Sequence, residues 1–231
     1  MRNTMNAQPV STSETLVPDD VRAILMSRAV QVRARKGQVV VGVGLSAGDV
    51  YLITEGRVAV SLVSATGRET ILRTIGPGQI FGELAAIDGA ARSADVIAME
   101  DVKLAVIPGA TFLDTLQAEP ALALWLVRHL TTQVRYLTDR VYELSNLAVG
   151  NRLLCELLRL AIEAGVSGDS AVFRAPTQAE MAARIGTNRE TVTREMTLLA
   201  GDGVIVRKGR HVEVPSLDRL AKLVRRTSPT G

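Results

Sequence analysis

The stretch "PTQAEMAARIGTNRETVTREMTLLAGDGVIVRKGRHVEV", residues 176–214, holds two short helical patterns and then two β-type runs. Thr177 followed by Glu180 three residues later is the signature of a capping box. We therefore expect a first helix from about Gln178 to Arg184. Gly186 suits the left-handed residue that often ends a helix, so the chain is predicted to turn there.

A second helix is predicted after Asn188, a good N-cap residue, and it carries "RETVTREMTLL". The run "VIVRKGRHVEV" then predicts a two-stranded wing that turns at Lys208-Gly209. The two helices are expected to share an apolar core made of Met181, Ile185, Val192, Met196 and Leu199. The side chains expected to face outward near the start of the second helix are Arg189, Glu190, Thr193 and Arg194.

This outward face has the chemistry of a DNA-reading helix. Arginine forks pair with guanine, and a carboxylate accepts a hydrogen bond from cytosine in the major groove. Residues 177–231 carry ten Lys and Arg against six Asp and Glu, a net charge of +4, whereas residues 1–176 carry −1. A basic C-terminal part favours an anionic partner. The alternative is a small helical bundle with a solvated basic face.

Composition excludes several other classes. The chain has 231 residues, 47% of them hydrophobic, which suits one large or two small domains. No apolar run reaches the roughly 18 residues that span a bilayer, and the first 15 residues lack a signal-peptide core, so we expect a cytoplasmic protein without a membrane contact. A single cysteine and two histidines give poor material for a disulfide framework, a metal site or a catalytic triad. No metal and no catalytic residue is therefore expected.

Residues 30–107 show short alternating or apolar runs that are cut by glycine, such as "VYLITEGRVAVSLV" and "VKLAVIP". The breaks have turn chemistry: they fall at Gly48-Asp49, Glu55-Gly56, Thr66-Gly67 and Gly76-Pro77-Gly78. This pattern is typical of a small all-β sandwich or barrel. We predict an antiparallel β-barrel with one short helix at residues 83–87.

A long helix is predicted from Pro120, because no glycine or proline follows until Gly150. Apolar residues along it alternate in steps of three and four, as in a coiled-coil seam. The seam residues are Val127, Leu130, Val134, Leu137, Val141, Leu144 and Ala148. The strict 3.5-residue period favours pairing with a second copy of the chain. The alternative is a helix that packs on its own barrel.

Barrel, long helix and winged helix–turn–helix in this order resemble the cyclic-AMP receptor protein/FNR superfamily of bacterial transcription regulators. The motif "FGEL…ARSA" is similar to the phosphate-binding cassette of cyclic-nucleotide domains, and "TNRETVTR" is similar to the recognition helix of the family. The resemblance implies an α+β fold. Its parts would be a flexible N-terminus (1–16), a jelly-roll-like cyclic-nucleotide-binding β-barrel (17–119), a dimerisation helix (120–149) and a winged helix–turn–helix DNA-binding domain (150–231).

By this resemblance, Arg92 would pair with the cyclic phosphate and Glu83 would accept the ribose 2′-hydroxyl. A guanidinium gives a charge-assisted bond to a phosphate, which fits that role. The implied ligand site comprises Gly82, Glu83, Leu84, Ala85, Arg92, Ser93, Ala94 and Thr138. The implied DNA-binding residues are Thr177, Gln178, Asn188, Arg189, Glu190, Thr193, Arg194 and Lys208. The alternative for Glu83 and Arg92 is a structural salt bridge.

The chain departs from the family pattern where the purine would lie. Cyclic-AMP sensors often have Thr-Ser on the dimer helix, and the corresponding residues here are Leu137-Thr138. Leucine cannot hydrogen-bond a base, whereas Thr138 can, and the Ser93 hydroxyl is compatible with guanine. Cyclic AMP and cyclic GMP therefore both remain open as effector. The iron–sulfur and haem branches fit worse, since the chain has one cysteine and neither histidine lies in the barrel.

The sequence thus predicts a homodimeric transcription regulator that binds double-stranded DNA, is switched by a cyclic nucleotide and works with RNA polymerase. Three alternatives stay open: a cyclic-nucleotide module that acts on a protein partner, a family member without effector, and a phosphodiesterase. The last is disfavoured because no metal-ligand cluster or nucleophile–base pair is present in the sequence.

Overall fold

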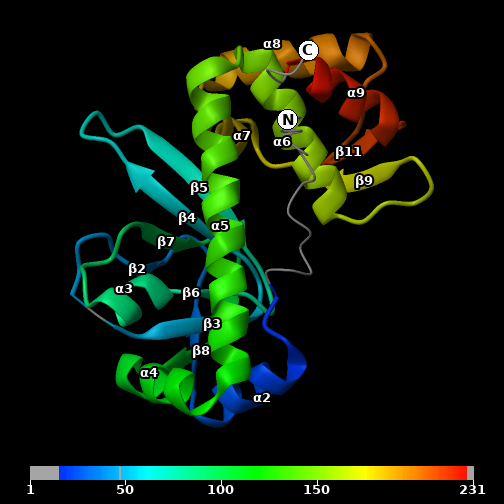
Figure 1. The fold of residues 1–231 in the computed structure, drawn as a ribbon. Helices are drawn as coiled ribbons and strands as arrows, with labels where there is room; N and C mark the ends of the chain where they lie inside the picture. Colours follow the sequence, from blue (N-terminus) through cyan, green and yellow to red (C-terminus); the bar gives the residue numbers. More distant parts are fainter. Residues whose placement is uncertain (1–15, 47, 228–231) are drawn as a thin grey trace, which may run out of the picture. The chain divides into compact units, whose positions relative to one another are not determined.

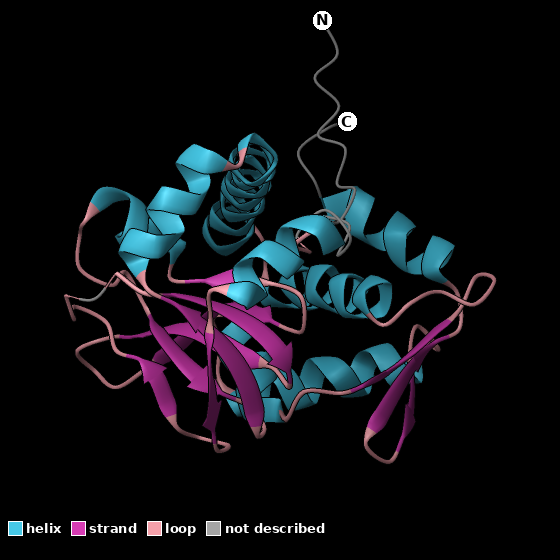
Figure 2. Cartoon of the chain, turned by 90° about the horizontal axis from the view of Figure 1, so that it is seen from below, coloured by secondary structure: helices cyan, strands magenta, loops and turns pink. Residues whose placement is uncertain are grey.

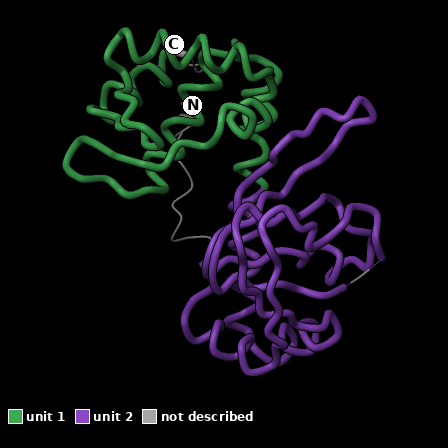
Figure 3. The backbone as a smooth tube through the Cα atoms, turned by 180° about the vertical axis from the view of Figure 1, so that it is seen from behind, with its two compact units in different colours: residues 1–12, 134–231 green, residues 13–133 purple. Residues whose placement is uncertain are grey.

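The computed structural model describes residues 16–46 and 48–227. The chain divides into two compact units, which Figure 3 colours separately: unit 2 is residues 13–133, and unit 1 is residues 134–231 with residues 1–12. The expectation of a flexible N-terminus falls almost wholly on residues 1–15, which lie outside the described part.

Unit 2 contains two four-stranded antiparallel sheets, drawn in magenta in Figure 2. The first has the order β1 (Val30–Ala34), β8 (Val102–Ile107), β3 (Val50–Glu55), β6 (Ile80–Phe81). The second has the order β2 (Val39–Val41), β7 (Asp95–Ala98), β4 (Val58–Val63), β5 (Glu69–Ile75). The predicted antiparallel β-domain is confirmed, as two separate jelly-roll-like sheets rather than one closed barrel.

Alternation along the strands explains the two cores of this unit. Val102 and Leu104 of β8 pack into the core between the sheets, whereas Ala105 and Ile107 pack against helices on the other face. Those helices are α2 (Asp19–Ser27), α4 (Gly109–Ala118) and the first turns of α5 (Pro120–Asn146). A strand buried on both faces reads as a nearly continuous apolar run, as "VKLAVIP" does.

The short helix expected at 83–87 is α3 (Glu83–Asp88). Helices α2 and α4 were not predicted from the sequence. Helix α4 starts at Gly109, where an added Cβ would lie 2.4 Å from the carbonyl oxygen of Gly48. This close approach of two backbones is a tertiary constraint, so a local pattern does not reveal it.

Helix α5 is the long helix of Figure 1. Most of its seam residues are exposed. Val127, Val134 and Val141 are each 60% exposed or more. Leu130 instead packs partly against the apolar core of unit 2. The helix ends at Asn146 rather than at the expected 149, because Ala148 adopts extended backbone and caps the next helix.

Unit 1 holds the predicted winged helix–turn–helix. Its elements are α6 (Val149–Glu163), β9 (Ala171–Arg174), α7 (Gln178–Ile185), α8 (Arg189–Gly201), β10 (Val206–Lys208), β11 (His211–Val214) and α9 (Leu217–Thr227). The wing has three strands in the order β10-β11-β9, since β9 adds to the two predicted ones. Helix α9, which packs on α6, was also not predicted.

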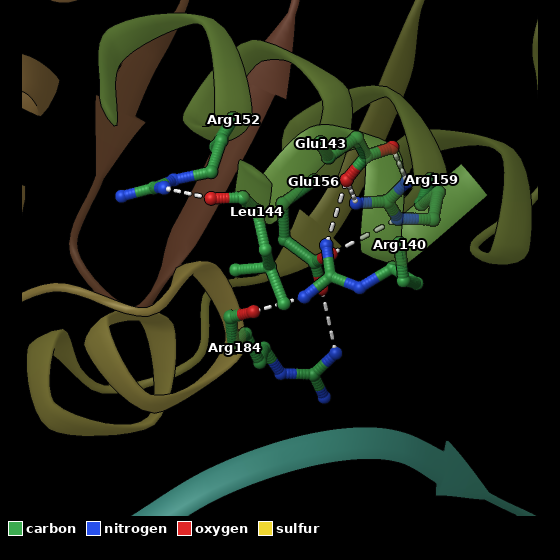
Figure 4. A network of polar contacts seen from close by, with 7 residues as sticks. All are labelled: Arg140, Glu143, Leu144, Arg152, Glu156, Arg159 and Arg184. Atoms are coloured by element: carbon green, nitrogen blue, oxygen red, sulfur yellow. Dashed lines mark hydrogen bonds and ion pairs between the residues drawn. The ribbon is translucent and has the colours of Figure 1, made fainter. Parts of the chain in front are cut away.

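A buried network of charges joins three helices of unit 1 (Figure 4). Arg159 of α6 donates two hydrogen bonds to Glu143 of α5, at 2.7 and 2.8 Å, and one to Glu156 at 3.0 Å. Arg184 of α7 donates to Glu156 at 2.8 Å. Arg140 of α5 donates to Glu143 at 2.8 Å and also to the main-chain carbonyl of Arg184. The network therefore fixes α7, the first helix of the helix–turn–helix, to α5 and α6.

The charges of the network shift the pKa of Glu156. Burial alone would raise this pKa, but the charges of Arg159, Arg184 and Arg140 outweigh burial and lower it to about 2. Glu156 is only 3% exposed, so solvent screens these interactions weakly. Removing one partner from a buried ion pair leaves an uncompensated charge and costs about 3–5 kcal/mol.

We predict that Glu156→Gln lowers the unfolding free energy of unit 1 by about 3 kcal/mol at pH 7. The folded pKa lies below the ordinary value of 4.5, so the stabilisation is complete above about pH 4.5 and is lost as the pH falls toward 2. Amide hydrogen exchange of α6 and α7 measures the loss. Wild type should lose stability across that pH window, and the variant should lose less.

Lys222→Gln is the control, because it breaks only the exposed pair of Lys222 with Asp218. Exposed pairs contribute about 0–1 kcal/mol, so the control should behave as wild type. Equal exchange rates in Glu156→Gln and wild type at pH 7 would contradict the stabilising role of the network.

Candidate ligand site and nucleic-acid interface

Arg92 and Glu83 are both buried in unit 2, at 4% and 2% exposure. The guanidinium of Arg92 donates to two main-chain carbonyls, those of Gly82 at 2.8 Å and of Asp49 at 2.7 Å. Its Cζ atom lies 5.8 Å from the centre of the Tyr51 ring. Among the described residues the partners of Arg92 are thus neutral, and its positive charge is not cancelled by Glu83. A buried, uncancelled cation attracts an anion.

Two buried polar atoms at this site have no hydrogen-bond partner among residues 16–46 and 48–227: Oε2 of Glu83 and Nε of Arg92. The other carboxylate oxygen of Glu83, Oε1, accepts a hydrogen bond from Nε2 of Gln133 on α5 at 3.2 Å. A buried polar group without a partner costs about 1–3 kcal/mol. One free acceptor and one free donor on neighbouring charged groups suit a ligand with both a hydroxyl and an anionic group.

Gly82 allows the close approach that brings Arg92 against the backbone. Its φ is +88°, a left-handed conformation that favours glycine, and it stands as N-cap of α3. An added Cβ would lie 2.6 Å from Nη1 of Arg92 and 2.7 Å from the carbonyl oxygen of Asp49. Glycine is therefore required here for two independent reasons.

The remaining residues of the expected ligand site differ in exposure. Ala85 and Ala94 are buried, whereas Leu84 and Ser93 are exposed. Thr138 belongs to unit 1, and its hydroxyl donates to the carbonyl of Val134 within α5. The structure thus brings together Gly82, Glu83 and Arg92 by direct contacts or close approach within unit 2.

Sequence reasoning missed two groups that contact the charged pair. One is the carbonyl of Asp49. It is a main-chain group that every residue type has, so the residue type at position 49 could not indicate this contact. The other, Gln133, does carry a signal: it stands on the long helix four residues after His129, and two polar side chains at this spacing share a helix face.

The helix–turn–helix of unit 1 is built as its caps predict. The Thr177 hydroxyl accepts a hydrogen bond from the amide of Glu180 at 3.2 Å, and the Glu180 carboxylate accepts one from the amide of Thr177 at 2.7 Å. Gly186 ends α7 in the left-handed conformation. Asn188 then caps α8 by accepting from the amide of Thr191 at 2.8 Å.

Helix α8 presents the expected polar face. Its four outward residues are all exposed: Arg189, Glu190, Thr193 and Arg194. On the opposite side Val192 and Met196 are buried, and Leu199 is half-buried. Lys208 of the wing is exposed and contacts Glu213 on the paired strand. Gln178, at the start of α7, is half-buried.

Groups that could support other chemistry are sparse in the described part of the chain. No cluster of three or more His, Cys, Asp or Glu there could hold a metal ion. Burial, with Glu143 as the next cause, raises the pKa of the Cys155 thiol to about 11, so this thiol stays protonated and unreactive. None of the described helices is both long enough and apolar enough to span a membrane.

Comparison with known proteins finds a family match in each of the two units. Residues 31–119 match the family model of the cyclic nucleotide-binding domain, and residues 151–223 match that of the Crp-like helix-turn-helix domain. A cyclic AMP receptor protein of Thermus thermophilus is 32% identical over 155 residues, which are 67% of this chain and 69% of that protein. A CRP-like cAMP-activated global transcriptional regulator of Mycobacterium tuberculosis is 28% identical over 82% of this chain and 86% of its own length.

A solved structure of a transcriptional regulator of the CRP/FNR family from Thermus thermophilus superimposes with a TM-score of 0.69. It is 28% identical to this chain, and the match covers 86% of this chain and all of that one.

We predict that Gly82→Ala destabilises unit 2 by about 2 kcal/mol more than Gly89→Ala. Both glycines have positive φ, so both variants carry the left-handed strain of about 1 kcal/mol. Only Gly82→Ala must also displace Arg92 from its two carbonyls, because nothing lies within 4 Å of a Cβ at Gly89. Denaturant unfolding followed by fluorescence of Trp125, the only tryptophan, gives both values. Equal losses would show that Arg92 is not held against Gly82.

Proposed function

Because this chain belongs to the cyclic-AMP receptor protein/FNR superfamily of cyclic-nucleotide-binding transcription regulators, which are not enzymes, we propose that it is a homodimer whose binding to DNA is switched by cyclic AMP. The observation that carries the proposal is the buried Arg92, whose described partners are neutral carbonyls, beside the buried Glu83 with one unpartnered oxygen.

A cyclic nucleotide satisfies both groups at once. Its phosphate supplies the negatively charged partner that is missing around Arg92. A charge-assisted bond to phosphate is stronger than one to a neutral carbonyl. Its ribose 2′-hydroxyl donates to Oε2 of Glu83, the carboxylate oxygen that has no partner. Gly82, without a side chain, keeps the backbone beside the ligand accessible.

The choice of base rests on less specific support. The relatives from Thermus and Mycobacterium are named as a cyclic AMP receptor and a cAMP-activated regulator, which favours adenine. Cyclic GMP is the second candidate, since Ser93 and Thr138 both offer hydroxyl groups and Leu137 offers none. Thr138 would contact the base, from the same chain or from the second copy.

The exposed seam of α5 supports the dimer. Val127, Val134, Leu137 and Val141 are at least 43% exposed and repeat at the 3.5-residue period of a coiled coil. A stripe of apolar side chains on a soluble helix is stabilised when a second helix covers it. The pair would place two copies of α8 for two successive major grooves, and the bound dimer would then meet RNA polymerase.

Switching requires the ligand to bind the DNA-competent state more tightly than the other state. By linkage, DNA must then raise the affinity for the ligand by the same factor.

Arg92→Ala tests the effector site. We expect the affinity for cyclic AMP to fall at least tenfold, because one charge-assisted bond is worth about 1.5–3 kcal/mol. The cyclic-AMP-dependent gain in DNA affinity, followed by fluorescence anisotropy, should disappear at the ligand concentration that saturates wild type. Arg68→Ala, which removes the same charge at an exposed turn, should behave as wild type. An undiminished response in folded Arg92→Ala would refute the site.

Glu190→Ala tests the DNA-reading helix. The wild-type dimer should select an inverted repeat, TGTGA followed by TCACA, with half-sites about 34 Å apart. The variant should lose its preference at one base pair per half-site, worth about 1–3 kcal/mol, with little change on random DNA. Lys208→Ala should instead weaken all sequences alike and reduce the salt dependence. The measurement is a selection of DNA binding sites by wild type and by Glu190→Ala at saturating cyclic AMP. An unchanged base preference in the variant, or a wild-type site without two-fold symmetry, would contradict the proposal.

A further inference from the structure

Two hydrogen bonds inside unit 2 connect helix α5 to the carboxylate of Glu83 at the candidate ligand site. Nε2 of Gln133 lies 3.2 Å from Oε1 of Glu83 and 2.5 Å from Nε2 of His129. His129 is fully buried, and its ring stacks on that of Trp125 with 5.0 Å between the centroids. The stack restricts the imidazole, which in turn restricts the amide of Gln133.

The proton positions in this chain follow from donor and acceptor chemistry. An ionised carboxylate can only accept, so the amide nitrogen of Gln133 must face Glu83. The second hydrogen of that nitrogen then points to Nε2 of His129, which must accept and therefore carries no proton. Burial, and after it the charge of Arg73, lower the pKa of His129 to about 4, so the imidazole is neutral at neutral pH.

We propose that Gln133, locked by His129, is a positioning residue for ribose recognition: it holds Oε1 of Glu83 and thereby directs Oε2 at the 2′-hydroxyl of the ligand. The proposal rests on the proposed function, in which Glu83 accepts that hydroxyl. An amide donor suits this task because it carries no charge. It orients the carboxylate without neutralising it, so the bond from Oε2 to the ligand remains charge-assisted.

The same contact has a second consequence. Gln133 stands on α5, and α5 also carries Arg140 and Glu143 of the buried network in unit 1. The residue that orients Glu83 is thus part of the helix that holds the helix–turn–helix. A purely structural role, in which Gln133 only packs α5 against α3, predicts no dependence on the ligand hydroxyl.

Gln133→Met separates the two roles, because methionine keeps the length of the side chain and removes the donor. Calorimetry measures the affinities for cyclic AMP and for 2′-deoxy cyclic AMP. Wild type should prefer the ribonucleotide at least tenfold. In the variant this ratio should drop at least fivefold, with the affinity for the deoxy ligand changed less than twofold. His129→Phe, which keeps the stack on Trp125, should reduce the ratio in the same direction.

Thr131→Ala, at an exposed position of the same helix, is the control and should change neither affinity. Equal losses for both ligands in Gln133→Met would leave only a structural role and overturn the proposal, as would an unchanged ratio. If wild type itself fails to discriminate the two ligands, the assignment of Glu83 falls first and Gln133 with it. Discrimination in wild type together with an unaffected variant refutes Gln133 alone.

Discussion

One helix, α5, supplies polar side chains to the contacts of both units. In unit 2, Gln133 of α5 donates to Glu83 at the candidate ligand site. Further along the same helix, Arg140 and Glu143 enter the buried network that holds α7. Gln133 of unit 2 and Arg140 and Glu143 of unit 1 are therefore residues of one helix.

The two contacts differ in strength and so have different roles. The network contains two carboxylates and three guanidinium groups, so the removal of either carboxylate takes the counter-charge away from buried guanidinium groups. It therefore behaves as a fixed joint between α5, α6 and α7. The bond from Gln133 to Glu83 is a single one, at 3.2 Å, beside an oxygen with no partner. Such a contact holds one carboxylate oxygen and leaves the other available to a ligand, as the proposed effector site requires.

The sequence predicted what local chemistry determines. The capping box at Thr177, the left-handed Gly186 and the cap at Asn188 each involve residues close in the chain, and the two helices began where these residues indicated. Strand β9 and the ion network could not be predicted in this way, because their partners are far apart in sequence. Glu83 and Arg92 were found through a family resemblance. The carbonyl of Asp49 that holds Arg92 is common to every residue type and gave no signal.

The central claim is that a cyclic nucleotide and DNA bind this chain with positive coupling. Calorimetric titration of cyclic AMP and of cyclic GMP into the free protein and into the DNA-loaded protein tests it most directly. The account predicts that DNA raises the affinity for the effector nucleotide, by the same factor by which that nucleotide raises the affinity for DNA. Equal nucleotide affinities with and without DNA, or no binding of either nucleotide, would contradict it.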